Sequence, residues 1–97
     1  MTVRNLSAAD DELVEAMLFY LEESPMAADR FVDEFERARK EILRDPLRNP
    51  IYEEALRVKV LRDFPFSIYY LVEEIEIVIV AVMHQARKPR YWKDRLG

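Results

Sequence analysis

The chain has 97 residues, of which 51% are hydrophobic, a size that suits one compact domain burying roughly 60 to 70% of its unfolded surface. It has no cysteine, one histidine and one glycine, which argues against disulfides, the usual zinc sites and glycine-rich phosphate loops. The net charge of -4 is uneven: residues 1–54 carry 14 acids and 7 bases, residues 55–97 carry 5 and 8. Without a bilayer-spanning run or signal-peptide pattern, we expect a single cytoplasmic domain over residues 1–97 that needs no metal or cofactor.

The N-terminal segment predicts a strand followed by a helix. Thr2–Leu6 favours a short strand, and Ser7 is suited to cap a helix with Asp10 as its capping-box partner. The helix is expected from about Ala8 to Glu23. Its predicted core stripe is Leu13, Ala16, Met17, Tyr20 and Leu21, and its predicted solvated acids are Asp11, Glu12, Glu15 and Glu22.

A second helix is expected over Pro25–Arg44. Ser24 can cap it, and proline is favoured at the first helical position because no partner is lost there. Asp45 precedes a proline and is therefore pushed out of the helical region, which ends the helix. Its predicted buried stripe is Ala28, Phe31, Val32, Phe35, Ala38, Ile42 and Leu43. The short connection between the two helices predicts an antiparallel hairpin.

The remaining chain changes to the two-residue period of strands. Residues 46–54 contain two prolines and no period, which indicates a loop, whereas 56–61 and 66–72 alternate in hydropathy. Residues 75–83 are apolar on both parities except for Glu76, which predicts a central strand. Glu73 and Glu74 must turn without glycine, so the turn is expected to be loose or longer than two residues. The predicted class is α+β, a helical hairpin packed on an antiparallel sheet with a basic C-terminal tail that can form a short helix.

Three motifs in this order resemble the RelE/ParE superfamily, the toxin halves of bacterial type II toxin-antitoxin modules, also called plasmid stabilization proteins. They are Ser24-Pro25-x-x-Ala28-x-x-Phe31, Phe66-Ser67-Ile68-Tyr69-Tyr70 and His84-x-x-Arg87-x-Pro89-x-Tyr91-Trp92. The resemblance covers essentially the whole chain and implies a β-α-α-β-β-β fold. The last motif is the most specific, because it directly follows an apolar strand at the end of the chain.

The resemblance implies one of two activities. RelE-like members are ribosome-dependent mRNA endoribonucleases, whereas ParE-like members inhibit DNA gyrase, and a cognate antitoxin neutralises both. The shared fold does not choose between them. A domain of the same superfamily with another target, or a non-toxic structural or adaptor domain, is the remaining alternative, and toxicity on expression without a partner distinguishes it.

Metal-free RNA cleavage requires several converging cations and a proton donor. Arg57 and Lys59 share one face of a predicted strand, and by resemblance they fall with Arg87 where the nuclease branch has catalytic bases. Tyr91 would correspond to the late catalytic tyrosine of that branch. The pattern departs at Ser67, which stands where that branch has an arginine, although Arg62 could substitute from the preceding turn. This gap favours the ParE-like alternative and makes an enzymatic activity the less favoured one.

The basic, aromatic end of the chain is the predicted target-binding surface of a ParE-like toxin. Its residues are Arg87, Arg90, Tyr91 and Trp92, with His84, Arg57 and Lys59 in support. Arginine and aromatic residues are enriched at binding hot spots, and a cationic cluster attracts nucleic acid or an acidic protein surface. The bland alternatives are a solvated tail, a Trp92 that closes the core, and a His84 that caps carbonyl groups or packs on a ring instead of acting as an acid or base.

The first helix carries apolar residues beyond its core stripe. Val14, Leu18 and Phe19 are the predicted antitoxin-binding residues, because an exposed apolar strip can receive an amphipathic helix or a strand. If these side chains are buried, the domain simply has a wide core. The expected partners are therefore a ParD-like antitoxin, in a hetero-oligomer, and DNA gyrase, or the ribosome and mRNA under the nuclease alternative.

Overall fold

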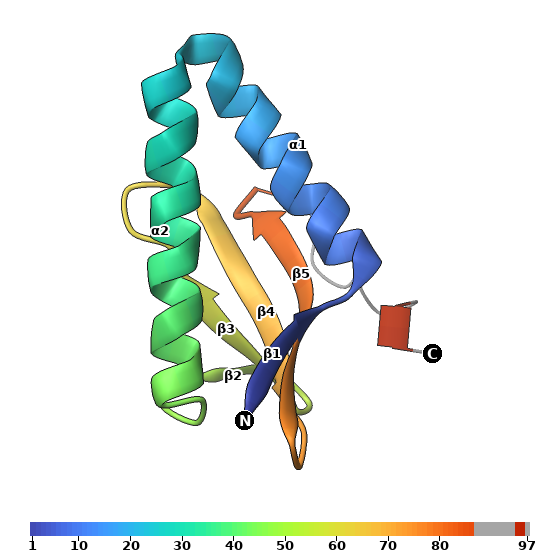
Figure 1. The fold of residues 1–97 in the computed structure, drawn as a ribbon. Helices are drawn as coiled ribbons and strands as arrows, with labels where there is room; N and C mark the ends of the chain where they lie inside the picture. The colour runs from blue at the N-terminus through green and yellow to red at the C-terminus, as the bar shows by residue number, and fades with distance from the viewer. Residues whose placement is uncertain (87–94, 97) are drawn as a thin grey trace.

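The computed structural model describes residues 1–86 and 95–96 and contains two helices and five strands (Figure 1). In chain order they are β1 (Thr2–Asn5), α1 (Ser7–Glu23), α2 (Pro25–Arg44), β2 (Ile51–Glu53), β3 (Leu56–Val60), β4 (Phe66–Val72) and β5 (Glu76–His84). In the described part of the chain, neither helix is long and apolar enough to cross a membrane. The expected short helix of the tail falls largely on residues 87–94, which lie outside the described residues.

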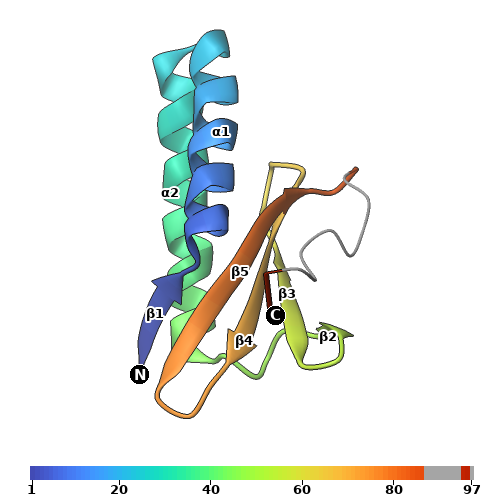
Figure 2. The same ribbon diagram turned by 90° about the vertical axis from the view of Figure 1, so that its right-hand side faces the viewer.

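The five strands form one sheet in the order β1-β5-β4-β3-β2. All neighbours are antiparallel except β1 and β5, which run parallel because the α1–α2 hairpin carries the chain across the sheet. Both helices cover the same face of the sheet (Figure 2). The predicted α+β architecture is therefore confirmed, with one parallel pair added to the antiparallel sheet.

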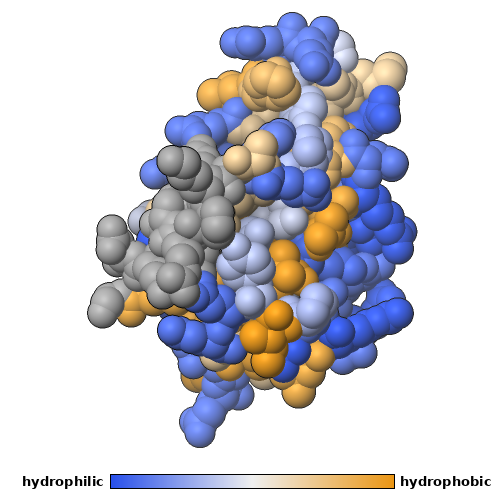
Figure 3. Space-filling model, turned by 180° about the vertical axis from the view of Figure 1, so that it is seen from behind, coloured by the Kyte–Doolittle hydropathy of each residue, from blue (hydrophilic) through white to orange (hydrophobic). Residues whose placement is uncertain are grey.

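The larger hydrophobic core lies between the helices and the sheet and includes Phe31, Phe35, Ile68 and Tyr70. A smaller cluster around Leu56 and residues of β5 forms a second core. Seen from behind, the described surface shows hydrophobic groups in separate patches among hydrophilic ones (Figure 3). The main packing energy therefore comes from the helix-facing side, where burial of each large side chain is worth about 1.5–3 kcal/mol.

The prediction of a loop over residues 46–54 is wrong in its second half, where β2 lies. Ile51 pairs with Arg57, and the register shifts between Ile51 and Glu53. Ile51 is 56% exposed and Tyr52 is 40% exposed, so this edge strand buries no apolar stripe. Three residues without a buried face give no two-residue period, which is why the sequence did not reveal the strand.

The predicted cap of α1 is also wrong. The helix begins at Ser7, Leu6 occupies the N-cap position, and no side chain caps it. The Leu6 N–H donates to the Ile79 carbonyl oxygen at 2.9 Å, which keeps Leu6 attached to the sheet and lets the helix start at the next residue. Asp10 accepts a hydrogen bond from the Asn5 amide at 2.8 Å instead of completing a capping box. At α2 the prediction is confirmed, because Ser24 accepts from the Ala27 N–H and Pro25 opens the helix.

The two predicted helical stripes are confirmed in part: Leu13, Met17 and Val32 are only half-buried, and the last residue of each stripe is exposed. Ala16 and Tyr20 of α1 are buried, but Leu21 is 46% exposed. In α2 the alanines, phenylalanines and Ile42 of the stripe are buried, whereas Leu43 is 39% exposed. Leu21 and Leu43 follow directly after Tyr20 and Ile42, so the helix turns each of them about 100° away from a fully buried neighbour.

β5 is the predicted central strand. It lies between β1 and β4, and its seven residues from Ile77 to Met83 are all buried. The strand begins at Glu76, one residue later than predicted. Ile75 lies in the turn and is 81% exposed. The turn covers residues 73–75, and the Glu73 N–H donates to the Glu76 carbonyl oxygen at 2.8 Å, so the prediction of a turn longer than two residues is confirmed.

Candidate functional site

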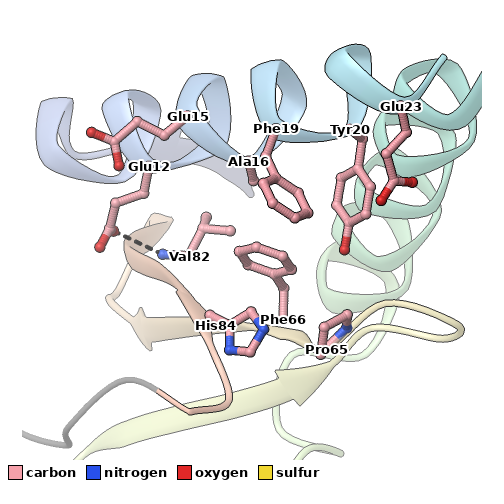
Figure 4. A pocket seen from close by; sticks show the side chains of 10 residues that line it. All are labelled: Glu12, Glu15, Ala16, Phe19, Tyr20, Glu23, Pro65, Phe66, Val82 and His84. Atoms are coloured by element: carbon pink, nitrogen blue, oxygen red, sulfur yellow. Dashed lines mark hydrogen bonds between the residues drawn. The ribbon is translucent and has the colours of Figure 1, made fainter. Parts of the chain in front are cut away.

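A cavity of about 530 Å³ opens between α1 and the neighbouring ends of β4 and β5. Phe19 and Tyr20 point down from α1 toward Phe66 of β4, with His84 at the end of β5 beside it (Figure 4). The ring centroids of Tyr20 and Phe66 are 6.2 Å apart, and those of Phe66 and His84 are 5.2 Å apart. The cavity is therefore an aromatic recess under a helix, a shape that receives an apolar side chain.

The wall and the mouth of this cavity differ in how closely their side chains are packed. Tyr20 is held by the rings of Phe31 and Phe64, at centroid distances of 5.2 and 5.0 Å, and burial raises the pKa of its hydroxyl, with a smaller effect from Glu23. Phe19 contacts only the edge of Tyr20 among described rings and is 57% exposed. The cavity thus has a closely packed aromatic floor and an exposed apolar lip.

Three carboxylates surround the recess, those of Glu12, Glu15 and Glu23. No histidine, aspartate or glutamate cluster in the described residues could hold a metal ion. The His84 ring packs edge-on against Phe66, and its Nδ1 accepts a hydrogen bond from the Ala86 N–H at 3.0 Å. His84 thus makes the ring contact expected of the structural alternative, in which it packs on a ring. The negative rim favours a ligand with positive charge.

The apolar strip expected on α1 is exposed. Val14, Leu18 and Phe19 are 48%, 50% and 57% exposed, and Leu21 extends the strip by a further turn. The wide-core alternative is therefore wrong: α1 buries Ala9, Ala16 and Tyr20 and leaves the three residues of the strip outside. An exposed apolar strip of this kind marks a surface that interacts with another molecule.

Arg57 and Lys59 share one face of β3, as predicted, but this face turns toward α2. Their cross-strand partners Tyr70 and Ile68 belong to the core under the helices. The Arg57 Nη1 donates to the carbonyl oxygens of Asn49 and Leu47 at 2.7 and 3.1 Å. Lys59 Nζ lies 2.6 Å from Glu41 Oε2 of α2. Both cations are thus already paired with groups of the same chain.

The carboxylates around Lys59 are strongly held. Hydrogen bonds from Lys59 and Arg37 lower the pKa of Glu41 to about 2. Burial alone would raise the pKa of Glu34, but the Arg37 side chain and the Arg62 N–H lower it by hydrogen bonding. Arg37 bridges the two carboxylates, at 2.6 Å from Glu34 and 2.7 Å from Glu41. This network fastens α2 to β3 and to the following turn.

The cations that could assemble a nuclease site are arranged differently from the expectation. Arg62 lines a polar depression with Lys59 and approaches Glu41 to 3.8 Å, so it does reach toward Lys59. Arg57 does not line that depression. Ser67, where the nuclease branch has an arginine, is only 3% exposed. Arg87, Arg90, Tyr91 and Trp92, predicted for target binding or catalysis, lie outside the described residues.

The expectation that Glu12 is only a solvated acid is wrong. Its side chain is 11% exposed, and its Oε1 accepts the Val82 N–H at 3.0 Å, as drawn in Figure 4. Arg95, near the end of the tail, lies 2.7 Å from the same oxygen. Helical periodicity placed Glu12 at the border of the core stripe, but it could not reveal that the edge of β5 lies beside it.

Two comparisons with known proteins, one of sequence and one of structure, identify similar proteins. A family model described as "ParE toxin of type II toxin-antitoxin system, parDE" matches residues 3–89. A solved structure titled "Chromosomal ParDE TA system from P. aeruginosa" is similar with a TM-score of 0.77 and 20% sequence identity, over 87% of this chain and 95% of that one. No curated protein sequence matches the chain. The structural similarity supports the same fold, and the family match covers almost the entire chain.

Proposed function

This chain belongs to the ParE toxin family of type II toxin-antitoxin systems, and from that premise we propose that it inhibits DNA gyrase and is neutralised by a ParD-like antitoxin. Such a toxin acts in the cytoplasm, where gyrase and DNA are found. The observation that carries the proposal is the family match over residues 3–89. The open surface of α1 supports the partner half of it.

The antitoxin docks on α1. Val14, Leu18 and Phe19 form the exposed apolar strip, and the aromatic cavity lies directly beside Phe19. Anchoring an apolar side chain in such a recess is how a few residues supply most of the binding energy of an interface. The contact strip belongs to a helix whose other face is fixed to the core, so docking on the strip leaves the core packing unchanged.

The target half rests on the chemistry of the tail. Arg87, Arg90, Tyr91 and Trp92 combine cations with aromatic rings, a composition suited to gripping an acidic protein surface or nucleic acid. Arg57 and Lys59 support target binding only indirectly, by stabilising the fold, because their charged groups already bind the Asn49 carbonyl and Glu41. That engagement, together with Ser67, speaks against a metal-free ribonuclease and for a toxin that binds its target without chemistry.

The test is plasmid supercoiling by purified gyrase with this protein titrated in, alone and after premixing with the antitoxin of the same operon. We expect loss of supercoiling with accumulation of cleaved DNA, both reversed by the antitoxin. Unimpaired supercoiling by folded protein contradicts gyrase as the target. Ribosome-dependent mRNA cleavage that requires Arg57, Lys59 and Arg87 would then take its place.

Truncation separates the two halves of the proposal. Removing residues 88–97 is expected to abolish gyrase inhibition while antitoxin binding survives, because the α1 strip lies outside the deleted segment. Arg44→Ala is the control, since it removes an exposed cation from the opposite helix. A truncated protein that is folded by circular dichroism and still blocks gyrase would move the target site away from the tail.

A further inference from the structure

Among the described residues, the C-terminal half of β5 is an open sheet edge, with no strand on its β1 side. β1 pairs with Glu76 to Ile79 only, and the chain leaves the sheet at Leu6, whose N–H donates to Ile79. From Val80 to His84, β4 is the one neighbouring strand among the described residues. The register skips Val80 between the pairs Ala81 with Tyr69 and Ile79 with Tyr70, so this residue forms a bulge.

Two side chains occupy the first part of this edge in the way that a strand would. The Glu12 carboxylate accepts the Val82 N–H at 3.0 Å, and the Arg95 guanidinium donates to the Val80 carbonyl oxygen at 3.2 Å. They also bind each other through both oxygens, at 2.7 and 3.2 Å. A neighbouring parallel strand bonds these same two backbone groups, Val80 C=O and Val82 N–H, through a single residue.

The ion pair is shielded, so Glu12 requires a cation. The side chains of Glu12 and Arg95 are 11% and 18% exposed. A carboxylate in such a position is costly to leave without a positive partner, whereas the paired and hydrogen-bonded state is tolerated. Any ligand that displaces Arg95 must therefore bring its own cation.

The edge leads directly into the aromatic cavity. Val82 and His84 of β5 line it together with Phe19 and Phe66, and Glu15 and Glu23 add negative charge at its rim. Along an extended segment successive side chains point to opposite faces, so a residue two positions from one beside Glu12 points to the same side. A positively charged residue followed at this spacing by an apolar one matches the surface.

We propose that Glu12 and the open edge of β5 form the receptor for an extended, arginine-bearing segment of the antitoxin, whose guanidinium replaces that of Arg95. The inference rests on the proposed function and specifies the chemistry of its partner. Arginine fits better than lysine, because its planar fork can hold both carboxylate oxygens while a further N–H reaches Val80. Arg95 is then an internal competitor that the antitoxin must displace.

The experiment measures the dissociation constant of the full-length chain and the full-length antitoxin of its operon by calorimetry at one salt concentration. Glu12→Gln keeps an acceptor for the Val82 N–H but removes the charge, and we expect it to weaken binding by about 30-fold or more. Glu22→Gln is the matched control, since Glu22 is an exposed acid of the same helix that does not line the cavity, and we expect a change below about 3-fold. Arg95→Ala should bind at least as tightly as the parent chain.

A second measurement replaces each arginine of the antitoxin by methionine. One replacement is expected to weaken binding to the parent chain and to have no further effect on the Glu12→Gln variant, the signature of a direct pair. If Glu12→Gln proves unfolded by circular dichroism, this scan and Arg95→Ala decide alone.

Unchanged binding by Glu12→Gln, weakening by Arg95→Ala, or a scan without any sensitive arginine overturns the inference and leaves the proposed function standing. A parent chain that binds no antitoxin at all overturns both.

Discussion

The two helices share one sheet face but differ in how they use their surfaces. α2 buries Phe31, Phe35 and Ile42. Its Glu34 and Glu41 bind Arg37 of α2 and Lys59 of β3, and Glu34 also accepts the Arg62 N–H of the following turn. α1 buries Ala9, Ala16 and Tyr20 and exposes Val14, Leu18 and Phe19 beside a cavity. The contrast teaches that α2 holds the fold together, whereas α1 is attached to the fold through Ala9, Ala16 and Tyr20 and offers a second apolar strip to a partner.

The sharpest way to break this contrast is to truncate one phenylalanine on each helix. Phe31 is 0% exposed and Phe19 is 57% exposed. Phe31→Ala is expected to lower the free energy of unfolding by about 3–5 kcal/mol, because it leaves a cavity in the core. Phe19→Ala should cost less than about 1 kcal/mol. Urea unfolding followed by circular dichroism measures both, and equal losses would contradict separate roles for the helices.

For antitoxin binding, unlike stability, we expect a substitution on α1 to have the larger effect. Leu18→Glu places a charge on the α1 strip and is expected to weaken antitoxin binding by about 2 kcal/mol, or about 30-fold, with stability unchanged within about 0.5 kcal/mol. Leu47→Glu is the control, since this leucine is 63% exposed and follows α2. Calorimetric titration compares the two, and an equal loss of affinity at Leu47 would show that exposure alone does not mark the docking face.

The starts of the helices give a smaller difference. The Ser24 hydroxyl accepts the Ala27 N–H at 3.0 Å, whereas no side chain caps α1 at Leu6 or Ser7. Ser24→Ala should lower the free energy of unfolding by about 1 kcal/mol, and Ser7→Ala should leave it within about 0.5 kcal/mol. A larger loss at Ser7 in thermal or urea unfolding would reinstate the capping box that the sequence suggested.

The smallest expected effect is a pH dependence confined to the α2 side. Because Lys59 and Arg37 lower the pKa of Glu41 from 4.5 to about 2, the folded state binds this proton less readily than the unfolded chain does. The stabilisation from Glu41 is therefore present above pH 4.5 and is lost as the pH falls toward 2. Urea midpoints from pH 6 to pH 2 should fall less steeply for Glu41→Gln than for the parent chain. Parallel curves would mean that Glu41 does not carry this dependence.

Much of this fold follows from periodicity and local chemistry. The caps around Ser24 and Asp45, the buried stripe of α2 and the central position of β5 could be predicted, because each depends on residues close in sequence or on a strong apolar pattern. β2 and the parallel pairing of β1 could not, since they depend on contacts between short segments that lack a buried period of their own.

The candidate site was only partly accessible from the sequence. The apolar excess of α1 was visible, and the exposed residues are the ones it indicated. The pairing of Glu12 with Val82 and Arg95 joins residues 70 and 83 positions apart, and a helical acid next to a buried stripe looks the same whether it faces water or a sheet edge. The pairing of Lys59 with Glu41 could not be predicted for the same reason, because it depends on the docking of α2 on β3.

The most direct test of the whole account is a gyrase supercoiling assay with the parent chain and Leu18→Glu, each with and without the antitoxin. The account predicts that both proteins block supercoiling alone and that the antitoxin restores it fully only against the parent chain, because the variant keeps its target surface and loses its docking strip. Equal restoration against both proteins would contradict the assignment of α1 to the antitoxin, and supercoiling that neither protein blocks would contradict gyrase as the target.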